Sequence, residues 1–364
     1  MSRRCASIIG RVIWPALCGV SLAITATTVA QPVPLPPLSP AAIAAGARIT
    51  HDAGFEFVTI GNQGGAGNPI VPDEYQSFPT PTPGFGRVDY EYRMSRTEVT
   101  CGQYFEFVRG YALYFNGTDT VEFLGLGIRV IGDRHNPDNY FIRPGWQNAP
   151  AEMGWRFAAR FCNWLQNDRA TTQQAFQTGA YDATSFTPDP PAGGLNDNTT
   201  RLPGAKFFLP TQNEWTKSMY YDPNRFGAGL EGYWQYPTTS ELVPVIGAPG
   251  APGTQTSTNV GFLPQPPFPI ASYPTVMSPW GLLDGSGGAR EWLEGNPALD
   301  TFSRAFRGTS QLGDSVFNDQ IGFGASGLRG VNSIIGLRLA ATVPAPFNIA
   351  GVILGGLVLS GRNR

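Results

Sequence analysis

The chain has 364 residues, of which 41% are hydrophobic and 14% are charged, and its formal net charge is −2. This length allows one large domain or two ordinary ones, and the near-neutral charge offers no electrostatic footprint for nucleic acid. With 45 glycines and 33 prolines, the composition favours many turns and excludes a helical bundle.

The first 30 residues have the pattern of a secretory signal. Basic residues precede an apolar segment over 12–29, and a Thr-Val-Ala sequence ends at Ala30. We expect cleavage before Gln31; the alternative is an N-terminal membrane anchor. Residues 31–50 are rich in Pro and Ala and are predicted to form an extended linker.

Two strands and three helices are predicted next. The strands cover 55–60 and 89–94, and the helices cover about 100–110, 155–166 and a stretch that starts at 211. Two of the helices begin with a capping box, formed by Thr100 with Gln103 and by Thr211 with Glu214. The remaining sequence reads as loops, of which 168–206 and 222–275 are long enough to suggest function or disorder.

Several aromatic residues fall in the predicted loops. They are Trp146, Tyr233, Trp234, Tyr236 and Trp280. Exposed aromatic rings beside polar loops can stack on sugars or peptides. Packing within a loop-rich core is the alternative.

The stretch PWGLLDGSGGAREWLEG, residues 279–295, is the most informative part of the chain. It places Asp284 and Glu291 seven residues apart with a run of glycines between them. Carboxylates together with backbone carbonyls are the ligands that calcium prefers. The alternative is a Gly-rich surface turn with two solvated acids.

Six blocks of the chain resemble, in order, the motifs of formylglycine-generating sulfatase-modifying factors. They are YRMSRTEVTCGQYFEF (92–107), MGWRFAARFCNWL (153–165), FLPTQNEW (208–215), GLLDGSGGAREW (281–292), FRGTS (306–310) and GLRLA (336–340). The resemblance implies a single α+β domain over 51–342, with the loop-rich formylglycine-generating-enzyme fold that is related to C-type lectins.

The resemblance also implies a structural calcium site. Its ligands would be the side chain of Asp284, the carbonyls of Gly287 and Ala289, and the side chain of Glu291. Arg290 stands where the family usually has Trp, so it could instead pair with one of these carboxylates and replace the ion.

The copper chemistry of the family is not expected here. Its cysteine pair follows the RGGSW block closely, and these positions fall near Gly313 and Asn318. Thiolates select copper(I), and no cysteine follows Cys162. The two histidines, His51 and His135, are too few for the three-histidine iron site of related sulfoxide synthases.

Two cysteines, Cys101 and Cys162, remain after the predicted signal. In an exported chain they allow one disulfide. The alternative is two buried free thiols, because free Cys packs like a small hydrophobe.

The C-terminal residues 343–364 combine a VPAP sequence, an apolar run over 347–359 and terminal arginines. This order resembles the bacterial PEP-CTERM sorting tail. The resemblance implies an exported envelope protein that contacts the membrane through its tail until an exosortase-type protease cuts it.

The sequence therefore predicts an exported, non-catalytic, calcium-stabilised envelope module that binds a protein or a glycan. The alternative is an oxidase-like or protein-modifying enzyme of the same family that uses residues other than the missing cysteine pair.

Overall fold

The computed structural model describes residues 33–61, 71–72, 84–117, 120–186, 197–261, 265–295, 303–328 and 335–344. The predicted signal over 1–30 and the apolar part of the predicted tail lie outside these residues. Within the described ranges, none of the helices combines the length and the apolar character that crossing a bilayer requires.

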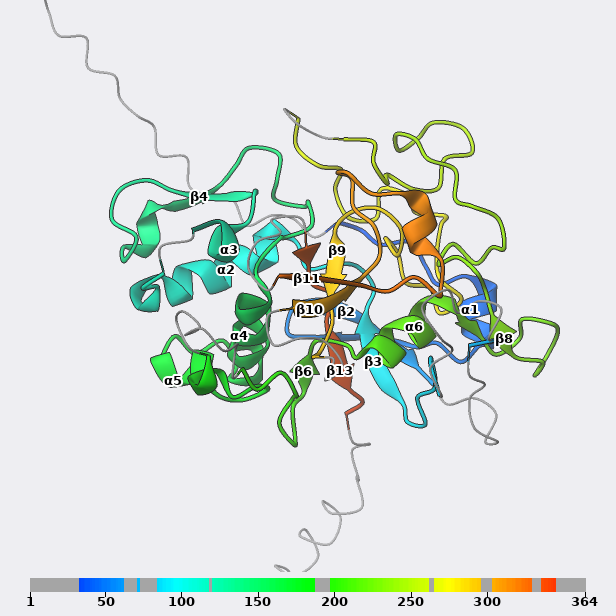
Figure 1. The fold of residues 1–364 in the computed structure, drawn as a ribbon, viewed down its shortest axis with the longest axis horizontal. Helices are drawn as coiled ribbons and strands as arrows, with labels where there is room; N and C mark the ends of the chain where they lie inside the picture. The colour runs from blue at the N-terminus through cyan, green and yellow to red at the C-terminus, as the bar shows by residue number, and fades with distance from the viewer. Residues whose placement is uncertain are drawn as a thin grey trace, which may run out of the picture.

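A five-stranded antiparallel sheet joins segments from the beginning, middle and end of the domain (Figure 1). In spatial order its strands are β1 (Ile49–Asp52), β2 (Phe55–Ile60), β3 (Tyr92–Ser95), β13 (Ala340–Thr342) and β6 (Phe207–Phe208). One row of partners crosses the sheet through Ile49, Val58, Met94, Ala340 and Phe208. The last strand in the sequence thus lies inside the sheet, between β3 and β6.

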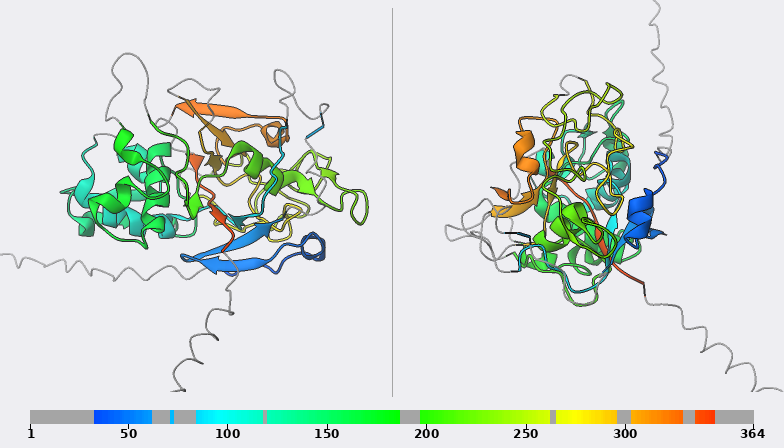
Figure 2. Two further views of the ribbon diagram at one scale, coloured as in Figure 1. Left: turned by 90° about the horizontal axis from the view of Figure 1, so that it is seen from below. Right: turned by 90° about the vertical axis from the view of Figure 1, so that its right-hand side faces the viewer.

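A second sheet of four strands carries the Gly-rich block. Its strands, in spatial order, are β11 (Ala325–Leu328), β10 (Ser303–Arg307), β9 (Arg290–Trp292) and β12 (Ile335–Gly336). β9 is antiparallel to β10 and parallel to β12, which places Glu291 opposite both Arg307 and Gly336. Figure 2 shows β1 and β2 on one side of the molecule and β11 on the opposite side.

Six α-helices are present in the described part of the chain. They are α1 (Pro40–Ala44), α2 (Cys101–Tyr111), α3 (Thr120–Leu124), α4 (Trp155–Gln166), α5 (Gln173–Gln177) and α6 (Gln212–Tyr220). Both predicted capping boxes are confirmed, at Thr100 before α2 and at Thr211 before α6. Helices α2 to α5 gather at one end of the molecule, and α6 packs toward the loops at the other end (Figure 1).

The short elements of the described ranges comprise two hairpins and four 3-10 turns. They are β4 (Ile128–Val130) with β5 (Tyr140–Ile142), β7 (Tyr221–Asp222) with β8 (Gly232–Tyr233), and the turns η2 (Ala112–Tyr114), η3 (Pro137–Asn139), η4 (Ala183–Ser185) and η5 (Val316–Asp319).

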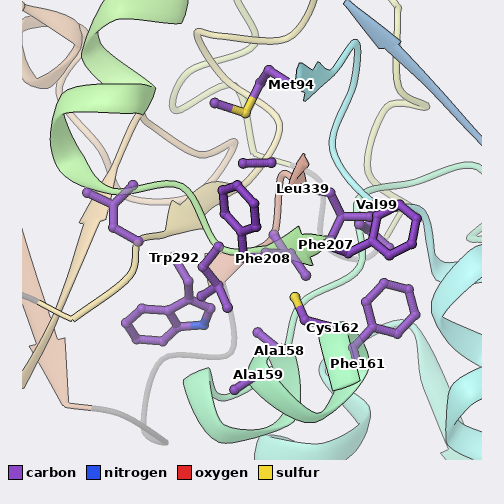
Figure 3. Packing of buried hydrophobic residues seen from close by; sticks show 14 of the residues in the cluster. Met94, Val99, Ala158, Ala159, Phe161, Cys162, Phe207, Phe208, Trp292 and Leu339 are labelled. Atoms are coloured by element: carbon purple, nitrogen blue, oxygen red, sulfur yellow. The ribbon is translucent and has the colours of Figure 1, made fainter. Parts of the chain in front are cut away.

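The core is rich in aromatic side chains. Phe107 on α2 lies at the centre of one cluster and contacts six other rings, those of Tyr104, Tyr111, Phe123, Phe161, Trp164 and Phe176. Figure 3 shows Cys162 and Phe161 of α4 facing Phe207 and Phe208 of the first sheet. The contacts between α4 and β6 connect the end of the molecule that carries α2 to α5 with the first sheet.

The structure departs from the sequence predictions in three places, the first of which is that α5 lies inside the loop predicted over 168–206. The second predicted strand, 89–94, is shifted to Tyr92–Ser95. The predicted linker over 31–50 contains α1 and the first residues of β1, because Ala42 and Ala45 bury their methyl groups in the core. Leu38 also packs over Gly281, where a Cβ would lie 2.5 Å from its side chain.

Candidate functional site

The Gly-rich block folds as a tight turn that leads into β9. Gly287 and Gly288 both have positive φ angles, of 81° and 68°. A Cβ at Gly287 would lie 2.4 Å from Ser257 Oγ, and one at Gly288 would lie 2.5 Å from Glu98 Oε1. Glycine is therefore required at both positions, for the conformation and for the close approach of other segments.

Glu291 is bound by an arginine from the GLRLA block. Arg338 Nε lies 2.9 Å from Glu291 Oε1 and 3.1 Å from Oε2, and Trp215 Nε1 donates to Oε2 at 2.5 Å. Burial opposes the charge of Arg338, but the Glu291 carboxylate outweighs burial and raises the pKa of Arg338. The pair is a closed internal salt bridge, with side chains that are 0% and 2% exposed.

The Arg338 guanidinium also reaches the turn. Its Nη2 donates to the carbonyl of Leu283 at 2.8 Å and to that of Asp284 at 3.3 Å. Arg290, which the sequence offered as a partner for Glu291 or Asp284, instead forms a bidentate pair with Asp314. Glu291 of this block does pair with an arginine, but that arginine is Arg338, which lies 47 residues further along the chain.

Glu98 is a member of the site that the sequence analysis did not identify. It lies just before α2, is 1% exposed, and its Oε1 accepts from Ala289 N at 2.7 Å. Its Oε2 is buried and has no hydrogen-bond partner among the described residues. Burial, followed by the charges of Asp284 and Glu291, raises the pKa of Glu98 well above its usual range. The signal was available, because Glu98 is the acid of the EVT sequence in the first family block.

Asp284 faces the same small cavity as Glu98. Its Oδ2 accepts from Ala271 N at 2.7 Å, and burial is the main cause that raises its pKa to about 6. The cavity has room for about one water molecule. Among its polar lining residues are Ser257, Ser286, Gln311 and Tyr273. Glu98, which is buried, and Asp284, which is partly buried, thus share one polar cavity with Arg338 nearby.

The calcium ligands implied by the family fit this structure in part. Asp284 and Glu98 offer carboxylate oxygens at one cavity, and the buried Glu98 Oε2 lacks a donor. Glu291 does not fit, because both of its oxygens already accept from Arg338. In the described ranges, no three His, Cys, Asp or Glu side chains converge in a way that could hold a metal.

The positions of the family's copper cysteines carry no sulfur. Gly313 lies in a turn with a φ of 71°, and Asn318 lies in η5. Cys101 and Cys162 lie elsewhere, on α2 and α4, and both are buried free thiols. The disulfide considered from the sequence is therefore not formed in this structure. Burial raises the pKa of both thiols, so neither is poised to act as a thiolate.

The two histidines lie on the surface, apart from the site. The side chains of His51 and His135 are 75% and 55% exposed, and each lies 3.3 Å from a neighbouring acid. Of the five aromatic residues considered for stacking, four are buried: Trp146, Tyr233, Tyr236 and Trp280. Only Trp234 is partly exposed, and its ring is covered by the Arg225 guanidinium at 3.5 Å.

Three solved structures are similar to this chain over about four fifths of its length. CarF matches with a TM-score of 0.45 and 18% identity, over 80% of this chain and 99% of CarF. Treponema denticola variable protein 1 matches with a TM-score of 0.45 and 18% identity, over 82% of this chain and 99% of that protein. PvdO from Pseudomonas aeruginosa matches with a TM-score of 0.42 and 13% identity, over 81% of this chain and 98% of PvdO. No family model matches the chain, and no curated protein matches it either.

The predicted α+β, loop-rich class is confirmed by the helices, strands and loops of the described residues. At these identities the likeness concerns the fold alone.

Proposed function

We propose that this chain is an exported, non-catalytic module of the cell envelope that binds a protein partner through an apolar surface segment. The first support is chemical: no thiol stands at the two positions where the family chemistry needs one. The second support, which carries the proposal, is a concentration of exposed apolar side chains in the long loop that follows α6.

Six of the fourteen exposed large hydrophobic side chains of the described residues fall between positions 226 and 246. They are Phe226, Leu230, Leu242, Val243, Val245 and Ile246. We call residues 226–246 the docking segment. Arg225 Nη2 and Glu241 Oε1 pair at 2.5 Å, which ties the β7–β8 hairpin to the chain just before Leu242.

The region around η5 adds to this surface. Ile321 N donates to Gln235 O at 3.0 Å, and Gln320 Nε2 donates to Tyr236 OH at 3.0 Å. These bonds hold the chain just after η5 against the docking segment. The exposed side chains of Phe317 and Phe323 lie a few residues before and after the bonded residues in the sequence. Contiguous exposed apolar surface is typical of interaction sites. We take the six side chains, which all fall within residues 226–246, to form such a surface.

The chemistry of the docking segment favours a protein over a glycan. Sugar-binding surfaces present aromatic platforms, and four of the five aromatic candidates are buried here. The exposed side chains are mainly Leu, Val and Ile, which offer a sugar neither stacking nor hydrogen bonds. An apolar face of another protein would complement them.

Export and sorting remain part of the proposal. Their support is the signal pattern over 1–30 and the PEP-CTERM-like order of features over 343–364. An exosortase-type protease would process the tail. Calcium would be the structural ion, with Asp284 and Glu98 as side-chain ligands and the carbonyls of Gly287 and Ala289 nearby in the chain. Its contribution would be to neutralise the buried Glu98 carboxylate and the partly buried Asp284 carboxylate.

We expect the protein to be inactive as a formylglycine-generating enzyme. Incubation of the purified protein with copper, oxygen and a sulfatase-motif peptide should leave the cysteine of the peptide unchanged, because the two positions that would supply thiolates for copper(I) carry no cysteine. Mass spectrometry of the peptide is the measurement. Appearance of the aldehyde product would refute both this expectation and the non-catalytic assignment.

The docking segment is tested by site-specific photo-crosslinking in intact cells. A photo-reactive amino acid at Val243 should give a discrete protein adduct. The matched control is the same residue at Ile131, which is 70% exposed and follows β4 at the other end of the molecule (Figure 1). Leu242→Glu should lower partner affinity about tenfold or more, since burying a leucine contributes about 1.5–3 kcal/mol.

An adduct of equal yield from both positions, or none from Val243, would count against the docking segment. An adduct whose added mass is removed by glycosidases but not by proteases would show that the partner is a glycan instead.

A further inference from the structure

A closed ring of five oxygen atoms lies beside the cavity, and neither the fold nor the proposed function explains it. Its members are Asp319 Oδ2, Ser286 Oγ, Thr256 Oγ1, Thr258 Oγ1 and Thr309 Oγ1. In that order around the ring, the successive distances are 2.5, 2.8, 2.7 and 2.6 Å, and 3.0 Å closes it back to Asp319. All five residues are buried, and all five contacts are within hydrogen-bond distance.

The number of available hydrogens distinguishes an ionised from a protonated Asp319 in this ring. The four hydroxyl groups supply four hydrogens, one each, and the five contacts need five. If Asp319 were ionised, it would take the hydrogens of Ser286 and Thr309. Thr256 and Thr258 would then have two hydrogens left for three contacts, so two oxygens would lie within 2.8 Å of each other with no hydrogen between them.

A protonated Asp319 removes this conflict. Each of the five oxygens then donates once and accepts once around the ring in one direction. The outer bonds remain compatible, because Thr258 N donates to Thr256 Oγ1 at 3.1 Å and Gly287 N donates to Thr309 Oγ1 at 3.0 Å. Each of these hydroxyls has a second lone pair for that purpose.

The surroundings of Asp319 agree with the neutral form. Its Oδ1 is buried and has no hydrogen-bond partner in the described part of the chain, which an uncharged carbonyl oxygen tolerates better than a carboxylate does. The facing charged or titratable groups are Arg307, Asp314 and Tyr220. Burial is the main cause that raises the pKa of Asp319 to about 7.

We propose that Asp319 holds a proton in the folded protein, and that loss of this proton opens the ring, which makes the ring a pH-sensitive latch on residues 256–258. These residues support the docking segment, since Ile246 forms a β-bridge with Thr256 and Gly247 N donates to Thr256 O at 3.1 Å. The docking segment would therefore be ordered when Asp319 is protonated and loosened when it is ionised. This last step rests on the proposed function, whereas the latch itself does not.

The direction of the pH effect follows from proton linkage. An aspartate in the unfolded chain ionises near pH 3.9, so folding takes up a proton at Asp319 between about pH 4 and pH 7. Its contribution to stability is full at the acidic end of this range and is lost as the pH rises through it. One proton changes the folding equilibrium constant by about tenfold per pH unit.

Asp319→Asn is the central variant, because an amide nitrogen at Oδ2 donates to both Ser286 and Thr309 and satisfies all five contacts without a titrating proton. Urea unfolding at a series of pH values between 4.5 and 7 (about half a unit apart) should give a shallower pH dependence than in the wild type. Per pH unit, the folding equilibrium constant of the wild type should change by about tenfold more than that of Asp319→Asn. Equal slopes would overturn the latch.

Thr258→Val provides a matched test that keeps the acid. Without the Thr258 hydroxyl, three contacts remain, and the hydroxyl hydrogens of Ser286, Thr256 and Thr309 are enough to fill them. An ionised Asp319 then leaves no pair of oxygens in contact without a hydrogen between them. The infrared band of a protonated carboxylic acid, identified by its absence in Asp319→Asn, should therefore disappear at a lower pH in Thr258→Val than in the wild type. No such band in the wild type at pH 5, or an unchanged titration in Thr258→Val, would refute the proposal.

The link to docking is tested separately. Crosslinking from Val243 should fall between pH 5 and pH 8 in the wild type and stay constant in Asp319→Asn. Absence of crosslinking at every pH would refute the proposed function and leave the latch to stand on its stability and infrared results. A parallel fall in both proteins would refute the link alone.

Discussion

Arg338→Ala is expected to lower the free energy of unfolding by about 3–5 kcal/mol. Arg338 and Glu291 are completely buried, and the substitution leaves the Glu291 carboxylate with Trp215 as its remaining hydrogen-bond donor. The carbonyls of Ser95, Leu283 and Asp284 lose a donor as well. Urea denaturation followed by tryptophan fluorescence measures the loss.

The matched control is Arg109→Ala. Arg109 also pairs with an acid, Asp138, at 2.7 Å, but the two side chains are 44% and 77% exposed. Such a surface pair contributes about 0–1 kcal/mol. A double variant, Arg338→Met with Glu291→Leu, should recover much of the loss, because it removes both buried charges. If Arg338→Ala costs no more than Arg109→Ala, the salt bridge is not the main support of the Gly-rich block.

Calcium is expected to stabilise the protein through Asp284 and Glu98. An ion that binds only the folded state at about 100 times its dissociation constant adds about 2.7 kcal/mol to the free energy of unfolding. A chelator should remove this gain from the wild type. Asp284→Ala and Glu98→Gln should each be insensitive to both calcium and chelator, as measured by thermal unfolding with metal analysis of the purified protein.

Asp138→Asn is the control for this experiment, because it removes an exposed carboxylate that does not line the cavity and should keep the full calcium response. The calcium site would be excluded if no metal copurifies and the wild-type melting temperature is the same with calcium and with chelator. A response that survives in Glu98→Gln but not in Asp284→Ala would remove Glu98 from the ligands.

The parts of the fold that depend on local sequence could be predicted. The helices at α2, α4 and α6 follow from apolar spacing, and two of them from capping boxes that act over three residues. The strand over Phe55–Ile60 was equally clear. The shift of β3 to Tyr92–Ser95 could not be seen, because its limits are set by pairing with β2 and β13.

The candidate site could be located from the sequence but not assembled. The Gly-rich block contains Asp284 and Glu291, yet the partners of its residues come from far away in the chain. Glu98 and Ala289 are 191 residues apart, and Arg338 and Glu291 are 47 apart. Spacing within a block gives no information about such contacts. For this reason the sequence suggested Arg290 as a partner of Glu291, whereas the actual partner is Arg338. The ring around Asp319 was missed for the same reason, since its five members come from four separate segments.

The position of β13 inside the first sheet has a consequence for how the chain is made. Among the described strands, β13 alone pairs with both β3 and β6, so a nascent chain that lacks residues 340–342 leaves two strands of this sheet without that partner. Contacts between segments so distant in sequence form slowly, because the intervening loop must be closed first. The first, five-stranded sheet therefore cannot be completed before residue 342 has left the ribosome. A translocation machinery that moves unfolded polypeptide would have the whole period of synthesis in which to engage the chain.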